Sequence, residues 1–303
     1  MSQLDTADRQ EPSEALAVKT ERLKEKLGKL EEEMAKLAAY EKQMLASPDR
    51  QISLTDPDSR SMATSGRGSG VVGYNVQVAV DTEHHLIIAH EVTNSGSDRA
   101  QLANMATRAK EALGFDKLKA IADRGYYSGE EIKTCADAGI EVTLPKPVTS
   151  GMEAKGQFGK HDFAYLAEQD VYRCPAGQML AYWLTTVDGE RTIRRYTTKA
   201  CGSCHLKARC TKAKYRVISR WEHEHVMEAA QKRLDVNPQA MRVRRETVEH
   251  PFGTLKMRMG ATHFLMKRLP KVATEMAFSV LAYNLTRVLN IIGVKPLIAA
   301  MGA

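Results

Sequence analysis

The sequence contains no apolar run of about 18 residues, which is the length that a transmembrane helix needs. Its first residues also lack the order of basic, apolar and small residues that marks a secretory signal peptide. These two absences predict a cytoplasmic protein that neither spans a membrane nor is exported. Cysteine is scarce as well, with five residues in 303. In a reducing compartment, these cysteines are expected to be thiols or metal ligands and not disulfides.

Size and charge set further bounds on the protein. A chain of 303 residues is long enough for about two domains, each with its own core. Lys and Arg number 44 against 37 Asp and Glu, which gives a net charge of +7 and a pI near 9.1. This mild excess of positive charge suits a polyanionic partner such as DNA without establishing one.

Residues 14–46 are predicted to form one long amphipathic helix. Apolar side chains recur there at seven-residue spacing, with two more at intermediate positions, at Leu16, Leu23, Leu30, Leu37 and Met44, and at Leu27 and Met34. Two interpretations stay open for this helix, an arm that packs on the same chain and an intermolecular coiled coil. The Ser- and Gly-rich residues 59–70 that follow are expected to form a flexible loop.

The next part of the chain reads as alternating strands and helices. The predicted order is strand, strand, helix, strand, helix, strand, over residues 71–81, 86–93, 98–113, 119–125, 128–139 and 140–145. Ser97 or Asp98 is the expected cap of the first helix, and Asp123 ends the third strand. This pattern predicts an α/β protein.

The remaining sequence divides into an insertion and a helical end. Residues 149–222 break into short strands and turns and carry four of the five cysteines. Helical periodicity returns over residues 222–234, 238–260 and 269–292. Four parts are therefore expected: a helical arm (1–50), the first part of a core (51–148), a cysteine-bearing insertion (149–222) and C-terminal helices (223–303).

One face of the helix predicted at 238–260 carries several charged residues. On an ideal helix, four charged residues fall within about 60° of arc: Arg242, Arg245, Glu249 and Lys256. An adjoining apolar stripe is formed by Met241, Val248, Phe252, Leu255 and Met259. A solvated face with an ordinary Arg245–Glu249 ion pair is the alternative. Pro251 interrupts the backbone hydrogen bonds, so these phases are approximate.

Asp123 and Glu249 together predict a divalent-metal site. Asp123 stands at the end of an apolar strand before a Gly-Tyr-Tyr turn, where carboxylates of α/β sheets face a site. Mg²⁺ and Mn²⁺ prefer carboxylate oxygens, and two such ions activate the attacking oxygen and stabilise the leaving oxygen of a phosphodiester. The neighbouring Arg242, Arg245 and Lys256 are expected to bind DNA phosphates. A surface turn is the alternative for Asp123.

The cysteines of the insertion predict a second metal site, of a structural kind. Cys201 and Cys204 form a CxxC pair, Cys210 follows six residues later, and Cys174 lies in a Cys-Pro turn. Four thiolates suit one tetrahedral Zn²⁺, and His205 could replace one of them. Unliganded thiols remain the alternative. Cys135 is expected to be a core residue.

Several motifs resemble a known family. The segments ADRGYYSGEEI and RRETVEHPFGTLK resemble the second-aspartate and glutamate motifs of bacterial insertion-sequence DDE transposases, and GYNVQVAVD and the cysteine insertion resemble the branch with a cysteine-bearing insert. The resemblance covers most of residues 50–290. It implies an RNase H-like mixed sheet, Asp123 and Glu249 as catalytic metal ligands, and Mg²⁺ or Mn²⁺ as cofactor. It further implies DNA cleavage and strand transfer at insertion-sequence ends by a homo-oligomer.

The chain departs from the family pattern in two places. Arg245, Glu249 and Lys256 match the glutamate helix, but Arg242 stands where a tyrosine is expected. Only two predicted strands precede the first core helix, and nothing before residue 67 reads as the strand that bears the family's first aspartate. The comparison with the family pattern therefore predicts that this strand and its aspartate are missing from this sequence. Asp81 is read as a turn residue, whereas Asp56 and Asp58 stay open as substitutes.

Three functions follow, in order of preference. The first is a DDE transposase in a truncated form without its first catalytic Asp. The second is a non-catalytic DNA-binding or oligomerising remnant that regulates an intact transposase. The third is an RNase H-like nuclease, which is less favoured because the spacing of Arg245, Glu249 and Lys256 is more specific to transposases.

Overall fold

A computed structural model describes residues 14–62, 70–147, 151–152 and 155–302. Most of the loop predicted at 59–70 lies outside the described residues. Two compact units are distinguished, and each is described by itself. The first comprises Met1–Asn75, Val92–Gly96 and Leu265–Thr274, and the second comprises Val76–Glu91, Ser97–Phe264 and Glu275–Ala303. The four parts predicted from the sequence remain a prediction.

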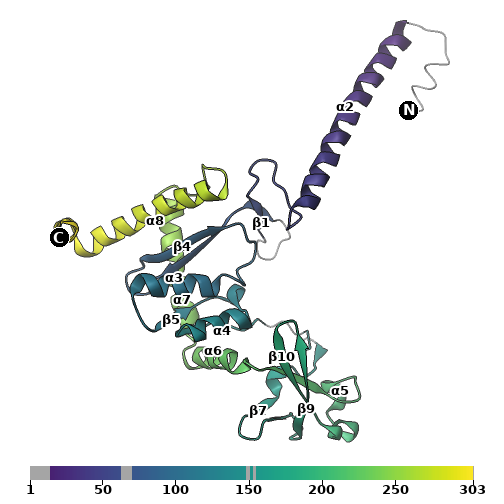
Figure 1. Ribbon diagram of the computed structural model, residues 1–303, viewed down its shortest axis with the longest axis vertical. Coiled ribbons are helices and arrows are strands. Elements are labelled where there is room, and N and C mark those ends of the chain that lie inside the picture. The colour runs from purple at the N-terminus through teal and green to yellow at the C-terminus, as the bar shows by residue number, and fades with distance from the viewer. Residues whose placement is uncertain (1–13, 63–69, 148–150, 153–154, 303) are drawn as a thin grey trace. The chain divides into compact units, whose positions relative to one another are not determined.

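The long N-terminal helix is confirmed with the predicted bounds. Helix α2 spans Glu14–Ala46 and forms one continuous rod (Figure 1). After it, β1 (Arg60–Met62) pairs antiparallel with β2 (Val71–Gly73). A short strand thus precedes residue 67, but β1 carries no aspartate, and the absence of the family's first strand with its aspartate stays a prediction.

The strands and helices of the second unit follow the predicted order. β3 (Asn75–Val80) pairs with β4 (Ile87–Thr93), and β5 (Leu118–Ile121) pairs parallel with β6 (Ile140–Thr143) through α4 (Gly129–Asp137). Such a parallel pair needs a crossover connection, which α4 provides. Among the described residues, these strands form separate two-stranded ladders. The mixed α/β class is confirmed, and the RNase H-like mixed sheet stays a prediction.

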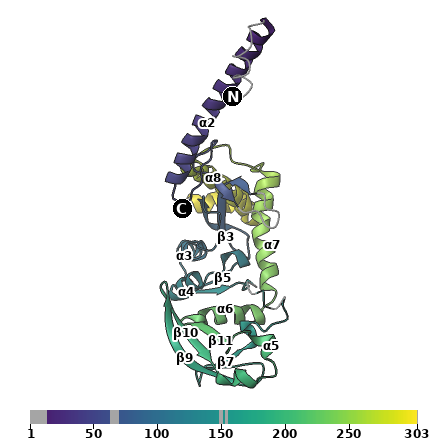
Figure 2. The ribbon, with the colours of Figure 1, turned by 90° about the vertical axis from the view of Figure 1, so that its right-hand side faces the viewer.

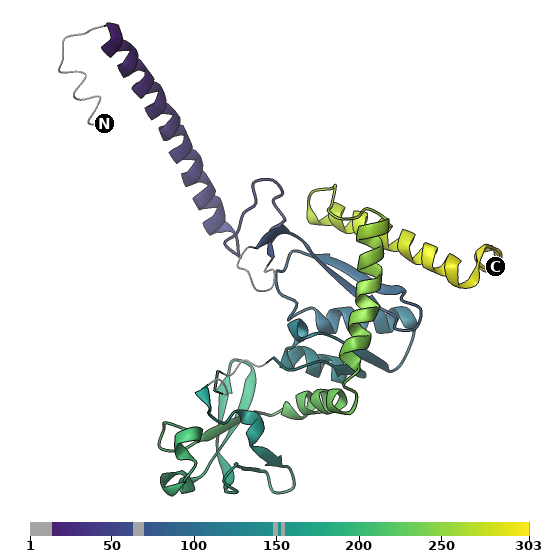
Figure 3. The ribbon, with the colours of Figure 1, turned by 180° about the vertical axis from the view of Figure 1, so that it is seen from behind.

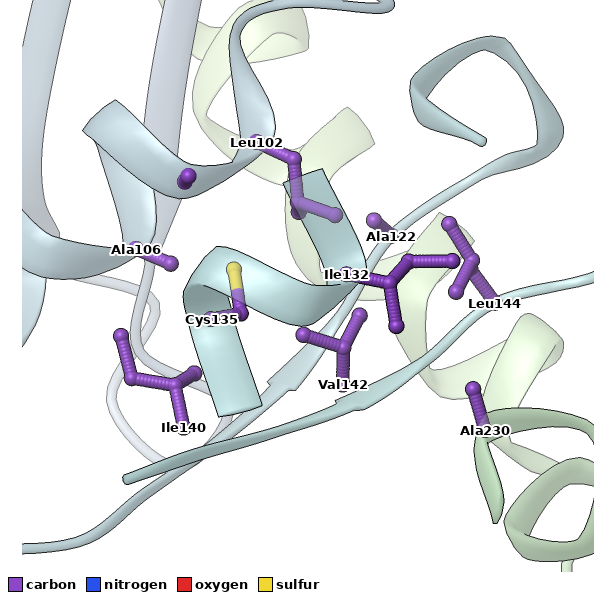
Figure 4. Close-up of a cluster of buried hydrophobic side chains, with 10 residues drawn as sticks. Leu102, Ala106, Ala122, Ile132, Cys135, Ile140, Val142, Leu144 and Ala230 are labelled. Atoms are coloured by element: carbon purple, nitrogen blue, oxygen red, sulfur yellow. The ribbon is translucent and has the colours of Figure 1, made fainter. Parts of the chain in front are cut away.

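A buried cluster holds these elements together (Figure 4). Ile140 and Val142 point inward from β6 while Glu141 between them is exposed, as the period of two in a strand requires. They meet Ile132 and Cys135 of α4, and Cys135 is fully buried as predicted. Burial, followed by a smaller effect of Glu131, raises the pKa of the Cys135 thiol to about 12. This thiol is therefore an inert core group.

Helix α3 (Leu102–Leu113) begins later than predicted. Its N-cap is Gln101, which makes no side-chain cap bond. The carboxylate of Asp98 accepts a hydrogen bond from the amide of Gln77, at 2.8 Å. The helix ends at Gly114, whose φ of 66° is a left-handed conformation that favours glycine.

The cysteine-bearing insertion folds around an antiparallel sheet of five strands in the order β11-β10-β9-β8-β7 (Figure 2). The strands are β7 (Ala164–Leu166), β8 (Val171–Arg173), β9 (Met179–Asp188), β10 (Arg191–Thr197) and β11 (Val217–Trp221). Short helices η3 (Lys160–Asp162), η4 (Lys199–Ser203) and α5 (Lys207–Cys210) complete it. Its own core contains Phe163, Tyr172, Leu180, Tyr196 and Ile218.

The helical C-terminal part begins with α6 (Glu224–Val236) and α7 (Ala240–Gly253). The buried Pro251 lies inside α7 and offers no N–H to the preceding turn. A π-helical segment, η5 (Thr254–Arg258), follows directly. The single helix predicted at 238–260 is thus an α-helix that changes its hydrogen-bond register after a proline.

The last two helices are α8 (Leu269–Ile292), with the predicted bounds, and α9 (Val294–Met301), which was not predicted. Gly293 separates them with a φ of 82°. No single helix in the described part of the chain is both long and apolar enough to span a membrane. Helices α8 and α9 pass that test only as a pair, with a bend of 116° between them.

Candidate active site

Asp123 stands two residues beyond the end of β5 and caps a short helix, η1 (Arg124–Tyr126). Its Oδ1 accepts a hydrogen bond from the backbone N–H of Gly125, at 2.8 Å. A Cβ on Gly125 would stand 3.1 Å from this oxygen and 3.3 Å from Oδ2 of Asp98. A side chain at this position would require these carboxylates to shift slightly, and the carboxylates of Asp98 and Asp123 lie near one another beside the turn. The sequence analysis did not foresee Asp98 at this place.

The side chain that meets Asp123 comes from α7. Nη2 of Arg244 lies 2.7 Å from Oδ2 of Asp123, and α7 packs against β5 (Figure 3). Sequence analysis placed Arg245 at the site instead. Arg244 follows the buried Ala240 by four residues and precedes the buried Thr247 by three, so its side chain lies on the packed face of α7. That spacing was the signal for Arg244.

Glu249 lies on the outer part of α7 and is exposed. On an ideal helix it is rotated by about 140° from Arg244. Among the described residues, the carboxylate of Glu249 forms no hydrogen bond or ion pair. The Arg245–Glu249 ion pair, which was the alternative considered for this helix face, is therefore not formed. Arg242 instead lies 3.9 Å from Glu246, with both side chains more than 60% exposed. The joining of Asp123 and Glu249 around a metal stays a prediction.

The basic face is exposed, and the packed face of the helix differs from the predicted apolar stripe. Arg242, Arg245 and Lys256 are all exposed, and the ammonium group of Lys256 lies 5.8 Å from the ring centroid of Phe252. The residues buried along α7 and η5 are Ala240, Thr247, Pro251 and Leu255. Of the predicted stripe, only Leu255 is buried, because small side chains on the neighbouring face allow a closer approach to the core.

A polar network supports the turn that follows Asp123. The hydroxyl of Tyr126 donates to Oε1 of Gln77, and the amide of Gln77 donates to Asp98. Gln77 is 1% exposed, so this network satisfies a buried amide. Burial and then the charges of Asp98 and Asp123 raise the pKa of Tyr126. The phenol is therefore a fixed hydrogen-bond donor at neutral pH.

The three aspartates considered as substitutes for a first catalytic aspartate all have other roles. Asp81 accepts hydrogen bonds from the backbone N–H groups of Glu83 and His84, which confirms it as a turn residue. Asp56 accepts from Arg268 N, at 3.1 Å, and Asp58 accepts from Leu269 N, at 2.9 Å. Asp56 and Asp58 thus cap the N-terminus of α8.

His250, which follows Glu249, connects α7 to α8 through a hydrogen bond with Tyr283. Nδ1 of His250 lies 2.9 Å from the hydroxyl of Tyr283, which donates to the carbonyl of His85. Because the Tyr283 proton is used there, Nδ1 of His250 must act as the donor. Burial and the nearby Arg287 hold the pKa of His250 below its usual value, with smaller effects of His85 and Arg258. His250 is therefore a neutral structural link.

The four insertion cysteines lie together, as the sequence predicts. Cys174, Cys201, Cys204 and Cys210 line one cavity of about 20 Å³. Arg216 lies against them, with its N–H 3.5 Å from Sγ of Cys201 and its guanidinium bonded to the carbonyl of Cys210. Within the described residues, however, no group of three or more Cys, His, Asp or Glu is arranged as a metal site.

A larger cleft of about 340 Å³ lies beside the site, where the turn after Asp123 approaches the insertion. Its lining includes three exposed cations and two aromatic rings, Arg99, Lys146, Arg191, Tyr127 and Trp221. The guanidinium of Arg191 lies 5.8 Å from the centroid of the Trp221 ring. Arg191 is also ion-paired with Glu130, and Glu224 lines the cleft too, so the cleft combines charges of both signs with flat apolar surfaces.

Residues 173–289 match the model of a protein family described as "Transposase DDE domain". The matched segment contains the four insertion cysteines, Arg244, Glu249 and Lys256, whereas Asp123 precedes it. No curated protein and no solved structure matches the chain. The match covers less than half of the chain, so it shows that this segment is similar to a DDE transposase domain, and the mixed α/β structure is consistent with that similarity.

Proposed function

We propose that this chain is the catalytic part of a bacterial insertion-sequence transposase, in which Asp123 and Glu249 are metal ligands and α7 holds DNA. The observation that carries the proposal is the ion pair between Arg244 and Asp123. It fastens the helix that bears Glu249 to the strand end that bears Asp123. Two motifs separated by more than 100 residues thereby meet at one place, and the family match covers the second motif.

The oxygen ligands at this place are of the type that a hard divalent cation prefers, but their present positions do not form a binding site. Asp123 offers carboxylate oxygens, whereas the carboxylate of Asp98 near the same turn is already bonded to the amide of Gln77. Arg244, however, already supplies a cation to Asp123. A bound metal would activate the attacking oxygen and stabilise the leaving oxygen of a phosphodiester. For Asp123 to bind it, Arg244 must withdraw, which frees its guanidinium for a phosphate.

DNA is held, in this proposal, by the exposed cations of the glutamate helix. Arg242, Arg245 and Lys256 face solvent and are not neutralised by close carboxylates, apart from the long Arg242–Glu246 contact. Arg99 and Lys146, which line the cleft near the turn after Asp123, add further cations to this part of the surface, whereas Arg191 there is paired with Glu130. Guanidinium and ammonium groups in such positions bind phosphates without reading sequence.

The catalytic proposal can be tested because it depends on how many carboxylates are available to bind metal. Two-metal phosphoryl transfer needs enough negative ligands to hold both ions close together. We expect the chain as given neither to nick nor to join insertion-sequence-end DNA in Mg²⁺ or Mn²⁺. Fusion to an upstream strand that bears an aspartate is expected to restore cleavage, and Asp123→Ala or Glu249→Ala is expected to abolish it. A geometric error on the order of 1 Å costs about 100-fold in rate, so the loss should be clear.

Two outcomes would contradict this assignment. Cleavage by the chain as given that survives Asp56→Ala and Asp58→Ala but is lost in Asp81→Ala would make Asp81 the first catalytic aspartate. No cleavage by any fused chain, with DNA binding intact, would favour the second candidate function. That candidate is a non-catalytic DNA-binding or oligomerising regulator, and the cation that Arg244 supplies to Asp123 is the observation that favours it.

We also propose that the four insertion cysteines bind one structural Zn²⁺. Their chemistry suits zinc, and their shared cavity exceeds the about 10–15 Å³ that holds one water molecule. Binding requires the sulfur atoms to move from their present positions to a tetrahedron. Purified protein should contain one zinc per chain, and Cys201→Ser with Cys204→Ser should lose it, whereas Cys135→Ala should not. Less than about a tenth of an equivalent of zinc, with a protease-resistant insertion, would contradict the proposal.

A further inference from the structure

The central part of the heptad face of α2 is exposed, whereas Leu23, Leu27 and Met44 of the same face are half-buried. Leu30, Met34 and Leu37 are 61%, 69% and 62% exposed, in a helix of 33 residues. No helix or strand of the described residues packs along it. Most helical stability in proteins comes from packing of an apolar face and not from intrinsic propensity. A helix about 50 Å long with such a stripe therefore needs a partner.

The heptad positions define the geometry of that partner. Leu23, Leu30, Leu37 and Met44 occupy the d positions, and Thr20, Leu27, Met34 and Glu41 occupy the a positions. Apolar residues at a and d form the seam of a coiled coil, and the flanking e and g residues set the orientation of the two helices. The polar a residues, Thr20 and Glu41, lie toward the two ends of α2, so the centre of the seam is apolar.

The flanking charges are segregated along the helix. The first half carries Lys24 at an e position and Lys19 and Lys26 at g positions, whereas the second half carries Glu31 at e and Glu33 at g. All five side chains are exposed. Within the helix, Lys24 lies 4.0 Å from Glu21, Lys29 pairs with Glu25 and Lys36 pairs with Glu33. All of these side chains are more than half exposed, so the pairs are weak and leave the flanking charges accessible to a partner.

A parallel pairing of two copies would be unfavourable. The g residue of one heptad then faces the e residue of the next heptad in the second copy. Lys26 would meet Glu31, but Lys19 would meet Lys24 on both sides of the seam. Glu41 would also face Glu41 of the second copy in the apolar seam, where like charges repel and are costly to bury. This orientation places like charges together at both ends.

An antiparallel pairing removes these conflicts. The e residues then face e residues and the g residues face g residues of the second copy. In the register that sets Leu27 against Leu30, Lys24 meets Glu31 and Lys26 meets Glu33, each twice by symmetry. The same register sets Leu23 against Met34 and separates the two Glu41 side chains. We propose that α2 pairs antiparallel with α2 of a second copy of this chain.

This inference goes beyond the proposed function and depends on neither the metal nor DNA. The test uses the full chain and analytical ultracentrifugation. The wild-type chain should be a dimer, and Lys24→Glu with Lys26→Glu should be a monomer because four attractive pairs become repulsive. Arg22→Glu with Lys29→Glu makes the same change of charge at outward c positions and should remain a dimer. A 1:1 mixture of the first variant with Glu31→Lys, Glu33→Lys should dimerise again.

Cross-linking decides the orientation. Thr20→Cys and Leu37→Cys chains should form a disulfide with each other when mixed, and neither should cross-link to itself through the new cysteine. Self-cross-linking of each variant would show a parallel pair and overturn the proposal. A monomeric wild-type chain, or a dimer that survives Lys24→Glu with Lys26→Glu, would also overturn it. DNA binding is measured on the same samples, so a failure of this interface is distinguishable from a failure of the proposed function.

Discussion

Arg244 and Arg245 are neighbours in sequence with different surroundings. Arg244 lies 2.7 Å from Asp123 with its side chain 25% exposed, whereas Arg245 faces solvent. A guanidinium next to a carboxylate competes with any metal that the carboxylate binds. The residue that controls access to Asp123 is therefore Arg244, and not a member of the exposed basic face.

A prediction for Mn²⁺ affinity follows from this ion pair. Because a partly exposed pair is worth roughly 0.2–1 kcal/mol, Arg244→Gln should tighten Mn²⁺ binding by about 1.4- to fivefold. Arg245→Gln removes the same charge from the outer face and should change it less. Titration of free Mn²⁺ by electron paramagnetic resonance measures both. Equal effects of the two variants, or weaker binding by Arg244→Gln alone, would contradict the role of Arg244 as a competitor.

His250 gives a prediction for stability against pH. Its pKa in the folded chain is lowered by burial and by Arg287, so the unfolded chain binds more protons in acid. The free energy of unfolding should therefore fall as the pH drops below about 6.5, the ordinary histidine value. His250→Asn keeps a polar partner for Tyr283 and should make this dependence shallower. Urea titrations at several pH values test it, and an unchanged slope would show that His250 titrates normally.

Among the elements, α8 is fixed at its first turn by aspartates that lie about 210 residues earlier in the chain. Asp56 is 8% exposed and accepts from Arg268 N and from the Tyr74 hydroxyl, at 2.7 Å. Burial opposes its ionisation, but these hydrogen bonds outweigh burial and hold the pKa of Asp56 below its usual value. An anionic carboxylate at a helix N-terminus also meets the positive end of the helix dipole. Asp56 and Asp58 are thus explained by the helix that they cap.

Loss of these caps should lower the free energy of unfolding without removing any residue of the proposed metal site. Asp58→Ala removes one cap and should lower the free energy of unfolding by about 1 kcal/mol. Asp56→Ala also leaves buried donors unsatisfied and should cost about 2–3 kcal/mol. Asp116→Ala, at an exposed carboxylate, is the matched control and should change little. Denaturant unfolding measures all three, and a null effect of Asp56→Ala would show that α8 does not depend on this contact.

For the molecule as a whole, the charge of +7 is a weak guide until its distribution is known. The exposed cations of α7 and η5 and those of the cleft beside Asp123 concentrate part of it on the second unit. Binding to phosphates releases counterions, so affinity for DNA should fall steeply with salt. This dependence reports how many phosphates the protein contacts.

DNA binding is expected without strong sequence preference. Arg242→Ala with Arg245→Ala should weaken binding to all sequences alike and reduce the slope of log affinity against log salt by about two. Lys117→Ala with Lys119→Ala removes the same charge from exposed positions at the start of β5 and should reduce the slope less. Fluorescence anisotropy over a salt series measures both. An affinity that is independent of salt would contradict the basic face as a DNA site.

The sequence by itself determined the elements whose signals are local. The bounds of α2 and α8 and the order of strands and helices around Asp123 follow from periodicity, because spacing along one segment decides which side chains share a face. The gathering of Cys174, Cys201, Cys204 and Cys210 was also predictable, since spacing of cysteines is a strong signal. The charges at the e and g positions of α2, on which the proposed antiparallel pairing rests, can also be read from the sequence.

Only the tertiary structure decided which of the charged residues meet. Arg244 contacts Asp123 and Arg245 does not, because the packed face of α7 is centred on Ala240, Thr247 and Pro251 and not on the larger apolar residues. The capping of α8 by Asp56 and Asp58 spans some 210 residues and leaves no periodic trace. Contacts of this kind depend on how two elements approach each other, and a single sequence records each element's pattern but not the angle and register of their packing.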